Sequence, residues 1–394
     1  MTAWLKREPL PDPCTHALVV GVSHYQFLPQ TDADPQPENR ETFGLRQPKT
    51  PATSGWKFAN WLKDSYNNPA APLGTVRLLL SPSDWEKQNV PALAGLPAEV
   101  LPATRDNVAA AVDEWHDACK TNPDNVAILY ASGHGIQISK DDGGIVLLED
   151  FAKEKSVLTQ SLDVPAVRAG MAGATMAQQQ FYFVDACAVR PKEAIDFKSM
   201  GQGVNLPNPF EGAARCSAVY YSASPSTEAL GEPGNGTLFV QALIDCLELA
   251  AVDTHTHENG WWVVTTSSLM KALEPRVKAL AKGFNATQDT TTGGQLAEVI
   301  FHVLPEPPKV PVTLELDPED VVAAATARLW DGVATSVFEG EKFTPKLTKS
   351  VPAGQYVLTV EIKPPVPGFE DQIPAFPVPA LPPEFVKKVA VPPA

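Results

Sequence analysis

The sequence predicts an α/β fold with a mostly parallel sheet flanked by helices, followed by a small all-β sandwich. Short continuous apolar runs, such as His16–Val22 and Val126–Ala131, are typical of buried strands, and segments with helical apolar spacing separate them. Strands that alternate with helices indicate right-handed crossovers and a parallel sheet covered on both faces. After about Pro305 the apolar residues alternate in the strand period instead, with turn residues between the segments.

The individual elements follow from these patterns in chain order. A polar, proline-rich stretch from Pro29 to Ser54 is too long and too poor in apolar residues for a helix or strand, so we interpret it as a flexible or functional loop. A good helix start at Thr104 precedes apolar residues at helical intervals. We expect strands at residues 16–22, 75–80, 126–131, 145–148, 180–185 and 218–223, and helices at 56–62, 104–119, 165–177 and 236–249.

Length and patterning predict two domains. A chain of 394 residues exceeds the ~250–300 residues that a single core usually reaches. We place an α/β domain at residues 1–304 and an accessory β-sandwich at 305–394, where the segment 351–360 resembles the closing hairpin of small immunoglobulin-like sandwiches. The proline-rich segment Lys363–Pro383 is interpreted as a semi-rigid excursion and not as a domain.

Composition excludes several classes of partner. The net charge of −15 and the pI near 4.9 argue against nucleic-acid binding, which needs a basic face, and against anionic lipid. Five cysteines at irregular spacing suit reduced thiols better than a disulfide framework. The chain shows no signal-peptide pattern and no apolar run long enough for a membrane span. We therefore expect a cytoplasmic protein without nucleic-acid, membrane or cofactor partners.

Chemistry-bearing residues follow two of the predicted strands. Residues 132–135 read Ser-Gly-His-Gly and include His134, and residues 185–187 read Asp-Ala-Cys and end on Cys187. In parallel sheets, ligands bind beyond the carboxyl ends of the strands, so these two ends are expected at one edge. An imidazole beside a thiol raises its thiolate fraction and can protonate a leaving amine. The N–H groups of Gly135 and Cys187 are natural oxyanion donors.

These segments resemble a known family. The succession Ala-Leu-Val-Val-Gly-Val, Ala-Ile-Leu-Tyr-Ala-Ser-Gly-His-Gly, Phe-Tyr-Phe-Val-Asp-Ala-Cys and Tyr-Tyr-Ser-Ala-Ser-Pro is similar to that of caspase and metacaspase peptidases over residues ~16–250. The resemblance implies a Cys–His dyad without an obligatory third member. It carries over His134 as general acid/base, Cys187 as nucleophile, and Gly135 with Cys187 as the oxyanion hole.

The resemblance also suggests what the S1 pocket binds. In metacaspase-like members the aspartate two residues before the cysteine receives Arg or Lys, and Asp185 matches that position. Relatives often carry a second acid at the start of the first helix, whereas residues 53–57 here have none. We favour a basic P1 residue over a small or acidic one, the alternative being that Asp185 caps a local turn. Ser222, Ser224 and Glu228 are secondary pocket candidates.

Activation and metal binding are less specified by the sequence. Caspase-type enzymes are often zymogens cut after the cysteine, by themselves or by an upstream protease, although basic residues there are equally explained as solvated charges. Two acids after His134 fall where some relatives bind calcium, but we favour turn residues and expect no metal. The candidate cleavage residues are Arg190, Lys192, Lys198 and Arg215, with Arg40, Arg46 and Lys49 in the early loop, and the two acids are Asp141 and Asp142.

The sequence thus predicts a cysteine endopeptidase that hydrolyses protein substrates, in the setting of a bacterial signalling or antiviral defence system that the family resemblance suggests. An inactive caspase-fold scaffold is the alternative, since such members exist and an added sandwich suits adhesion. The intact Gly-His-Gly and Asp-Ala-Cys motifs favour catalysis, because a scaffold needs neither. An acyl transferase or esterase with the same dyad is a third hypothesis.

Overall fold

The structure is a computed structural model and describes the chain except residues 1–2, 32, 137–143, 155, 188–200, 208–213, 224–228, 254–261 and 334. By their internal contacts the residues divide into two compact units. The first unit comprises Met1–Ile244 and Met270–His302, and the second comprises Asp245–Leu269 and Val303–Ala394.

The first unit is built on a seven-stranded sheet with the order β1-β3-β2-β4-β8-β9-β13. The five inner strands run parallel, whereas the edge strands β1 and β13 are antiparallel to their neighbours. This confirms the predicted mostly parallel sheet. The strands are β1 (Leu5–Lys6), β2 (Thr15–Val22), β3 (Leu73–Ser81), β4 (Val126–Gly133), β8 (Gln179–Ala186), β9 (Cys216–Tyr221) and β13 (Thr291–Gln295).

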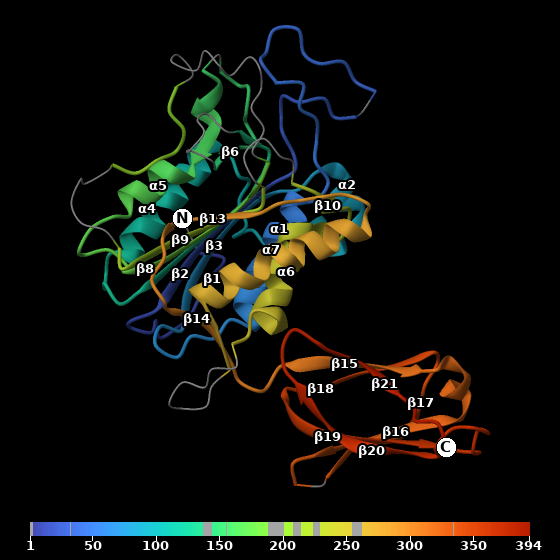
Figure 1. Cartoon of the computed structure of the whole chain (residues 1–394). Helices are drawn as coiled ribbons and strands as arrows, with labels where there is room; N and C mark the ends of the chain where they lie inside the picture. The colour runs from blue at the N-terminus through green and yellow to red at the C-terminus, as the bar shows by residue number, and fades with distance from the viewer. Residues whose placement is uncertain are drawn as a thin grey trace. The chain divides into compact units, whose positions relative to one another are not determined.

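Helices cover both faces of this sheet, with α4 and α5 on one side and α1, α6 and α7 on the other (Figure 1). Leu18 of β2 is fully buried in a cluster with Val112 and Trp115 of α4. On the opposite face Phe58 of α1 stacks on Tyr130 of β4, with ring centroids 4.8 Å apart. The helices are α1 (Pro51–Asp64), α2 (Asp84–Asn89), α3 (Pro91–Ala94), α4 (Arg105–Cys119), α5 (Val164–Gly170), α6 (Leu238–Asp245) and α7 (Thr266–Gly283).

Short elements lie between the longer ones in both units. A three-stranded sheet of β5, β6 and β7 begins directly after His134. A π-helical turn, Cys246–Ala250, and a 3-10 turn, Val157–Gln160, lie between the longer elements. The short strands are β5 (Gly135–Ile136), β6 (Ile145–Leu147), β7 (Ser161–Asp163), β10 (Gly231–Glu232), β11 (Gly236–Thr237), β12 (Trp262–Thr265) and β14 (Ile300–Leu304).

The second unit contains a β-sandwich. Its sheets have the orders β18-β15-β21 and β17-β16-β19-β20, and between them Leu314, Leu329 and Leu358 are fully buried. Alternating burial along β15 and β19 matches the strand-period pattern of the sequence. The strands are β15 (Lys309–Asp317), β16 (Ala325–Asp331), β17 (Ser336–Lys342), β18 (Lys346–Pro352), β19 (Gly354–Ile362), β20 (Gln372–Ala380) and β21 (Phe385–Ala390), with a 3-10 turn at Glu319–Ala324.

The interpretation of Lys363–Pro383 as an excursion is wrong, because this segment contains β20. Pro377 and Pro379 face Val357 and Gln355 of β19 in the antiparallel register. Proline lacks the N–H that an inner strand needs, but β20 is the last strand of its sheet and leaves one side unpaired. The proline content therefore marks an edge strand.

The proline-rich stretch 29–54 was interpreted as a loop over its whole length, but its last residues are helical. Helix α1 begins at Pro51, where a proline in the first turn needs no N–H partner. The helices α2 and α7 were not predicted, and α5 ends at Gly170, well before the predicted end at residue 177.

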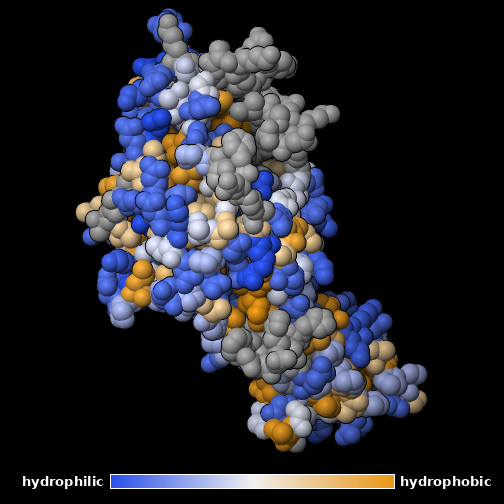
Figure 2. Space-filling model, turned by 90° about the vertical axis from the view of Figure 1, so that its left-hand side faces the viewer, coloured by the Kyte–Doolittle hydropathy of each residue, from blue (hydrophilic) through white to orange (hydrophobic). Residues whose placement is uncertain are grey.

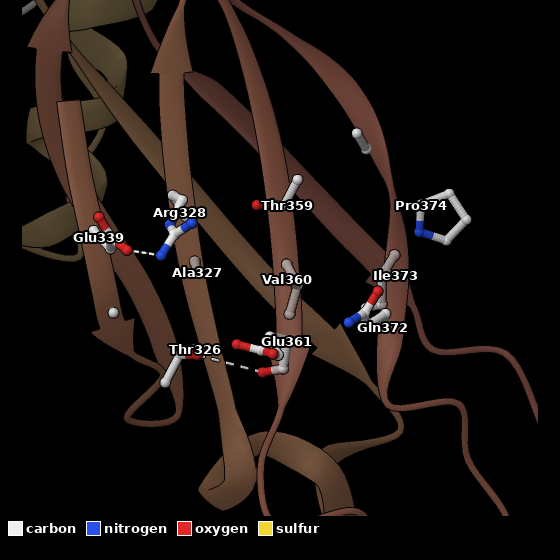
Figure 3. A pocket seen from close by; sticks show the side chains of 12 residues that line it. Thr326, Ala327, Arg328, Glu339, Thr359, Val360, Glu361, Gln372, Ile373 and Pro374 are labelled. Atoms are coloured by element: carbon white, nitrogen blue, oxygen red, sulfur yellow. Dashed lines mark hydrogen bonds and ion pairs between the residues drawn. The ribbon is translucent and has the colours of Figure 1, made fainter. Parts of the chain in front are cut away.

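A pocket of about 590 Å³ lies on the sheet of β16, β17, β19 and β20 (Figure 3). Arg328 and Glu339 form an ion pair at one side of it, and the Thr326 hydroxyl donates to the carbonyl of Glu361 at 3.5 Å. The register shifts at this point in both flanking strand pairs, β16 with β17 and β19 with β20. The pocket therefore reflects two local irregularities of the sheet and holds neither His134 nor Cys187.

The face shown in Figure 2 is mostly hydrophilic, with hydrophobic side chains scattered among polar ones. Among the residues that the structure describes, none of the helices combines the length and the apolar content that crossing a membrane requires.

The carboxylate beside the first turn of α1 belongs to a residue of another helix, α2. Glu86 of α2 is fully buried and accepts hydrogen bonds from the N–H and the hydroxyl of Thr53, at 3.0 and 2.8 Å. It also accepts from the N–H and the hydroxyl of Ser83, at 3.0 and 3.1 Å, in a capping box. The carboxylate thus caps α2 and places a negative charge at the start of α1, which has no acid in its own first turn.

Replacing this carboxylate is expected to destabilise the first unit. Glu86→Ala leaves four buried donors without their acceptor, so the free energy of unfolding should fall by about 3 kcal/mol or more in chemical denaturation. Glu274→Ala, which removes an exposed ion pair with Lys278, should cost less than about 1 kcal/mol. Equal losses in the two variants would contradict the capping role.

Candidate active site

The pairing of β4 with β8 brings the two predicted strand ends together. The parallel register pairs Gly133 with Ala186, so His134 and Cys187 are the next residues of adjacent strands. Neighbouring strands lie about 4.8 Å apart, which places the two backbones side by side at the carboxyl edge of the sheet.

Gly135 lies so close to Cys187 that only glycine fits. A Cβ atom on Gly135 would stand 2.2 Å from the carbonyl oxygen of Cys187 and 2.7 Å from the Cβ of Ala186. Contacts below 3.0 Å to backbone atoms require the chain to shift. The glycine after His134 therefore allows the backbone of β5 to pass close to the backbone of Cys187. The two predicted oxyanion donors, the N–H groups of Gly135 and Cys187, thus lie in neighbouring backbone segments.

Two residues of the loop between β2 and α1 hold His134. Its Nε2 lies 2.6 Å from the carbonyl oxygen of Arg46, and its backbone N–H donates to the Tyr25 hydroxyl at 2.8 Å. The Tyr25 ring packs on the imidazole, with centroids 5.2 Å apart. Because a carbonyl oxygen only accepts, Nε2 carries the proton, and Nδ1 is the nitrogen left for acid–base exchange.

Burial lowers the pKa of His134 from its ordinary value of 6.5, and the hydrogen bond to Arg46 partly opposes that change. The imidazole is therefore neutral near pH 7, the form that can accept a proton. The sequence did not predict Arg46 or Tyr25 as contacts of His134. Arg46 acts through its backbone carbonyl, for which no residue type is a signal, although the loop itself was identified as a functional candidate.

Cys187 is half-buried, whereas the other four cysteines are buried. The backbone N–H of Ala229 donates to its Sγ at 3.2 Å. A hydrogen bond to sulfur favours the thiolate, because the charged form is the better acceptor. Ala229 was not predicted either, since its contribution is again a backbone group.

Another cysteine and histidine, Cys14 and His16, are in side-chain contact away from this edge of the sheet. Cys14 Sγ lies 3.3 Å from His16 Nε2 at the start of β2, and both residues are buried. Burial, with a smaller effect from Asp12, raises the pKa of the Cys14 thiol to about 11, and burial, with Arg77, lowers the pKa of His16 to about 4. This pair holds a neutral thiol and a neutral imidazole.

Asp185 is enclosed by hydroxyl groups. The residue is 1% exposed, and its Oδ2 accepts from Tyr130 at 2.5 Å, from Ser132 at 3.3 Å and from Thr237. Its Oδ1 is buried and has no hydrogen-bond partner in the part of the chain that the structure describes. Burial raises the pKa of Asp185 to about 6, and the hydroxyl groups oppose this rise. An orphaned carboxylate oxygen marks a place where a ligand donor would be favourable.

The other pocket candidates are placed in part. Ser222 is buried and donates to the carbonyl of Ala186 at 3.1 Å, next to the strand end that carries Cys187. Ser224 and Glu228 lie outside the described residues. Ser54 was not predicted, yet its hydroxyl accepts from the N–H of Thr237 at 2.8 Å and so joins the start of α1 to the Asp185 enclosure.

Most candidate cleavage and metal residues lie outside the described residues, namely Arg190, Lys192, Lys198, Asp141 and Asp142. Arg215 is exposed, but the bond that follows it enters β9, whose first residue, Cys216, is fully buried. In the early loop Arg40 donates to the carbonyls of Ala152 and Lys153. In the chain that the structure describes, no cluster of three metal-ligating side chains occurs.

The first unit is an α/β fold whose mostly parallel sheet carries His134 and Cys187 at one edge. A family model of the caspase domain matches residues 91–287, half of the chain. The chain belongs to the caspase family. The crystal structure of caspase-1 from Spodoptera frugiperda is similar with a TM-score of 0.42 at 11% sequence identity, over 73% of this chain and 89% of that chain. A sequence search among curated proteins finds no match.

Alkylation should distinguish Cys187 from the other thiols. Iodoacetamide near pH 7.5 is expected to modify Cys187 at least ~10-fold faster than the four buried cysteines, as measured by peptide mass spectrometry over time. Cys187→Ala should remove the fast phase without changing the slow one. Earlier modification of Cys14 would show that contact with a histidine, and not exposure with an N–H donor, controls reactivity.

Proposed function

We propose that the chain is an active cysteine endopeptidase with Cys187 as nucleophile and His134 as general acid/base, cutting protein substrates after Arg or Lys. The observation that carries the dyad is the register of β4 and β8, which makes the two residues neighbours at the carboxyl edge. The Arg46 carbonyl adds support, because it fixes the imidazole tautomer with Nδ1 free for the thiol proton.

In the proposed reaction His134 Nδ1 takes the thiol proton, and the Cys187 sulfur attacks the scissile carbonyl carbon. The oxyanion forms beside the backbone N–H groups of Gly135 and Cys187. The imidazolium then returns the proton to the leaving amine as the C–N bond breaks, which leaves an acyl-thioester on Cys187. Water, deprotonated by the same imidazole, attacks the thioester and releases the acid and the thiol.

Asp185 supports a basic P1 residue. A buried, orphaned carboxylate oxygen two residues before the nucleophile is a favourable partner for a guanidinium or ammonium group. The second acid of metacaspase-like relatives has no equivalent here. The start of α1 carries Ser54 and no acidic residue. The nearby carboxylate of Glu86 in α2 already accepts hydrogen bonds from Thr53 and Ser83. Proteolytic activation and a bacterial signalling or defence setting stay expectations from the family resemblance.

The proposal is tested with fluorogenic peptides that carry Arg, Lys, Asp or Ala at P1. The wild type should hydrolyse the Arg and Lys peptides, and Cys187→Ala should lower kcat by about 10³-fold or more. Cys14→Ala, which removes the buried thiol that contacts His16, should keep the wild-type rate. Hydrolysis that survives in Cys187→Ala would rule out this nucleophile, and preference for the Asp peptide would rule out the basic pocket.

Asp185→Asn should separate substrate binding from stability. Because the folded pKa of about 6 lies above the ordinary value of 3.8, this carboxyl favours the folded state when protonated and opposes it as pH rises through 6. At pH 7.5 the variant should be more stable than the wild type by up to about 3 kcal/mol in urea denaturation, a gain that shrinks toward pH 4.

The same variant should lose at least ~100-fold in kcat/KM for Arg peptides, since the neutral amide cannot pair with the cation. In the wild type, kcat/KM should rise with pH through about 6 as Asp185 ionises. Unchanged kinetics in Asp185→Asn would remove Asp185 from S1 and leave the dyad assignment intact.

A further inference from the structure

Two residues far apart in one loop meet at His134. Tyr25 follows β2 and accepts the N–H of His134 at 2.8 Å, while Arg46 lies near the other end of the loop and its carbonyl faces Nε2 at 2.6 Å. The imidazole keeps one orientation only if these two ends of the loop keep a fixed separation.

The side chain of Gln47 joins the two ends. Its Oε1 accepts the backbone N–H of Tyr25 at 2.8 Å, and its Nε2 donates to the carbonyl of Tyr25 at 2.8 Å and to that of Leu28 at 3.3 Å. One amide thus pairs with both backbone groups of residue 25, as a neighbouring β-strand would. These partners also fix which end of the amide is oxygen.

Gln47 is linked to the Arg46 carbonyl by geometry. That carbonyl belongs to the peptide group between residues 46 and 47, which is planar and rigid. Anchoring the side chain of Gln47 on Tyr25 therefore sets the direction of the oxygen that faces His134. The contacts form a closed circuit that runs from His134 to Tyr25, to Gln47, through one peptide plane to Arg46, and back to His134.

We propose that Gln47 is a positioning residue for the catalytic histidine: its amide clamps the two ends of the β2–α1 loop so that the Tyr25 hydroxyl and the Arg46 carbonyl hold His134 in its reactive orientation. This inference rests on the proposed function of His134. The hydrogen bonds described for Gln47 reach residues 25 and 28 and neither member of the dyad, so its effect is transmitted through the loop.

Gln30 provides a matched control within the same loop. Its Nε2 donates to the carbonyls of Tyr25 and Leu28, at 3.2 and 2.9 Å, which are the same two acceptors that Gln47 uses. It does not share a peptide group with Arg46. Loss of Gln30 removes comparable hydrogen bonds from the loop but leaves the circuit closed.

The test compares Gln47→Met, Gln47→Glu and Gln30→Met in the full chain. Methionine keeps the length of the side chain and removes its hydrogen bonds, whereas glutamate keeps the acceptor for the Tyr25 N–H but cannot donate to the Tyr25 carbonyl. Both Gln47 variants should lower kcat and the iodoacetamide rate at Cys187 by ~10–100-fold, with KM within about 3-fold, because misplacement of a catalytic group acts on the chemical step. Gln30→Met should change neither rate by more than about 3-fold.

Three outcomes overturn the inference. The first is wild-type kcat and alkylation rates in both Gln47 variants; the second is an equal loss in Gln30→Met; the third is a loss confined to KM. Thermal unfolding of each variant identifies a folding defect, and Gln47→Glu keeps the test decisive if Gln47→Met unfolds. Alkylation of Cys187 requires no peptide hydrolysis. If the wild type hydrolyses no peptide, the proposed function is refuted, but the alkylation rates of the variants still test the role of Gln47.

Discussion

The parallel ladder between β4 and β8 is the constraint on which the site depends. Its register pairs Gly133 with Ala186, and a shift by one residue would turn every side chain of one strand to the opposite face. That register is fixed by burial on both faces, where Leu129 and Tyr182 pack toward α4 while Tyr130 and Phe183 pack toward α1. The stability of the sheet core and the relative placement of His134 and Cys187 therefore have the same physical origin.

Around this ladder the site is completed mainly by backbone groups. A carbonyl at Arg46 faces the imidazole, an N–H at Ala229 faces the thiol, and the absence of a side chain at Gly135 lets β5 pass over Cys187. Backbone groups are held by the fold and need little reorganisation during a reaction, which favours preorganised electrostatics. The unfavourable free energy of burying polar groups is greatest at Asp185, whose buried carboxylate has one oxygen without a hydrogen-bond partner among the described residues.

The pair Cys14 and His16 and the pair Cys187 and His134 occupy different environments in one sheet. Cys14 and His16 lie at the amino end of β2, deep in the sheet, where burial keeps both groups neutral. His134 and Cys187 lie at the carboxyl end, where loops supply polar backbone groups and the thiol is half-buried. This difference agrees with the rule that ligands bind beyond the carboxyl ends of parallel strands.

The sequence by itself determined the buried strands, the parallel sheet, the β-sandwich and the two strand ends that carry His134, Asp185 and Cys187, because apolar periodicity and short motifs are local properties. The tertiary structure alone decided the partners of these residues. Arg46 and Ala229 act through backbone groups, for which no residue type is a signal. Gln47 acts through its side-chain amide, but only the folded loop brings its partners Tyr25 and Leu28 within reach. The strand β20 was not predicted for a similar reason. Its prolines are compatible with a strand only at the edge of a sheet. Which strand lies at the edge is decided only when the sheet forms.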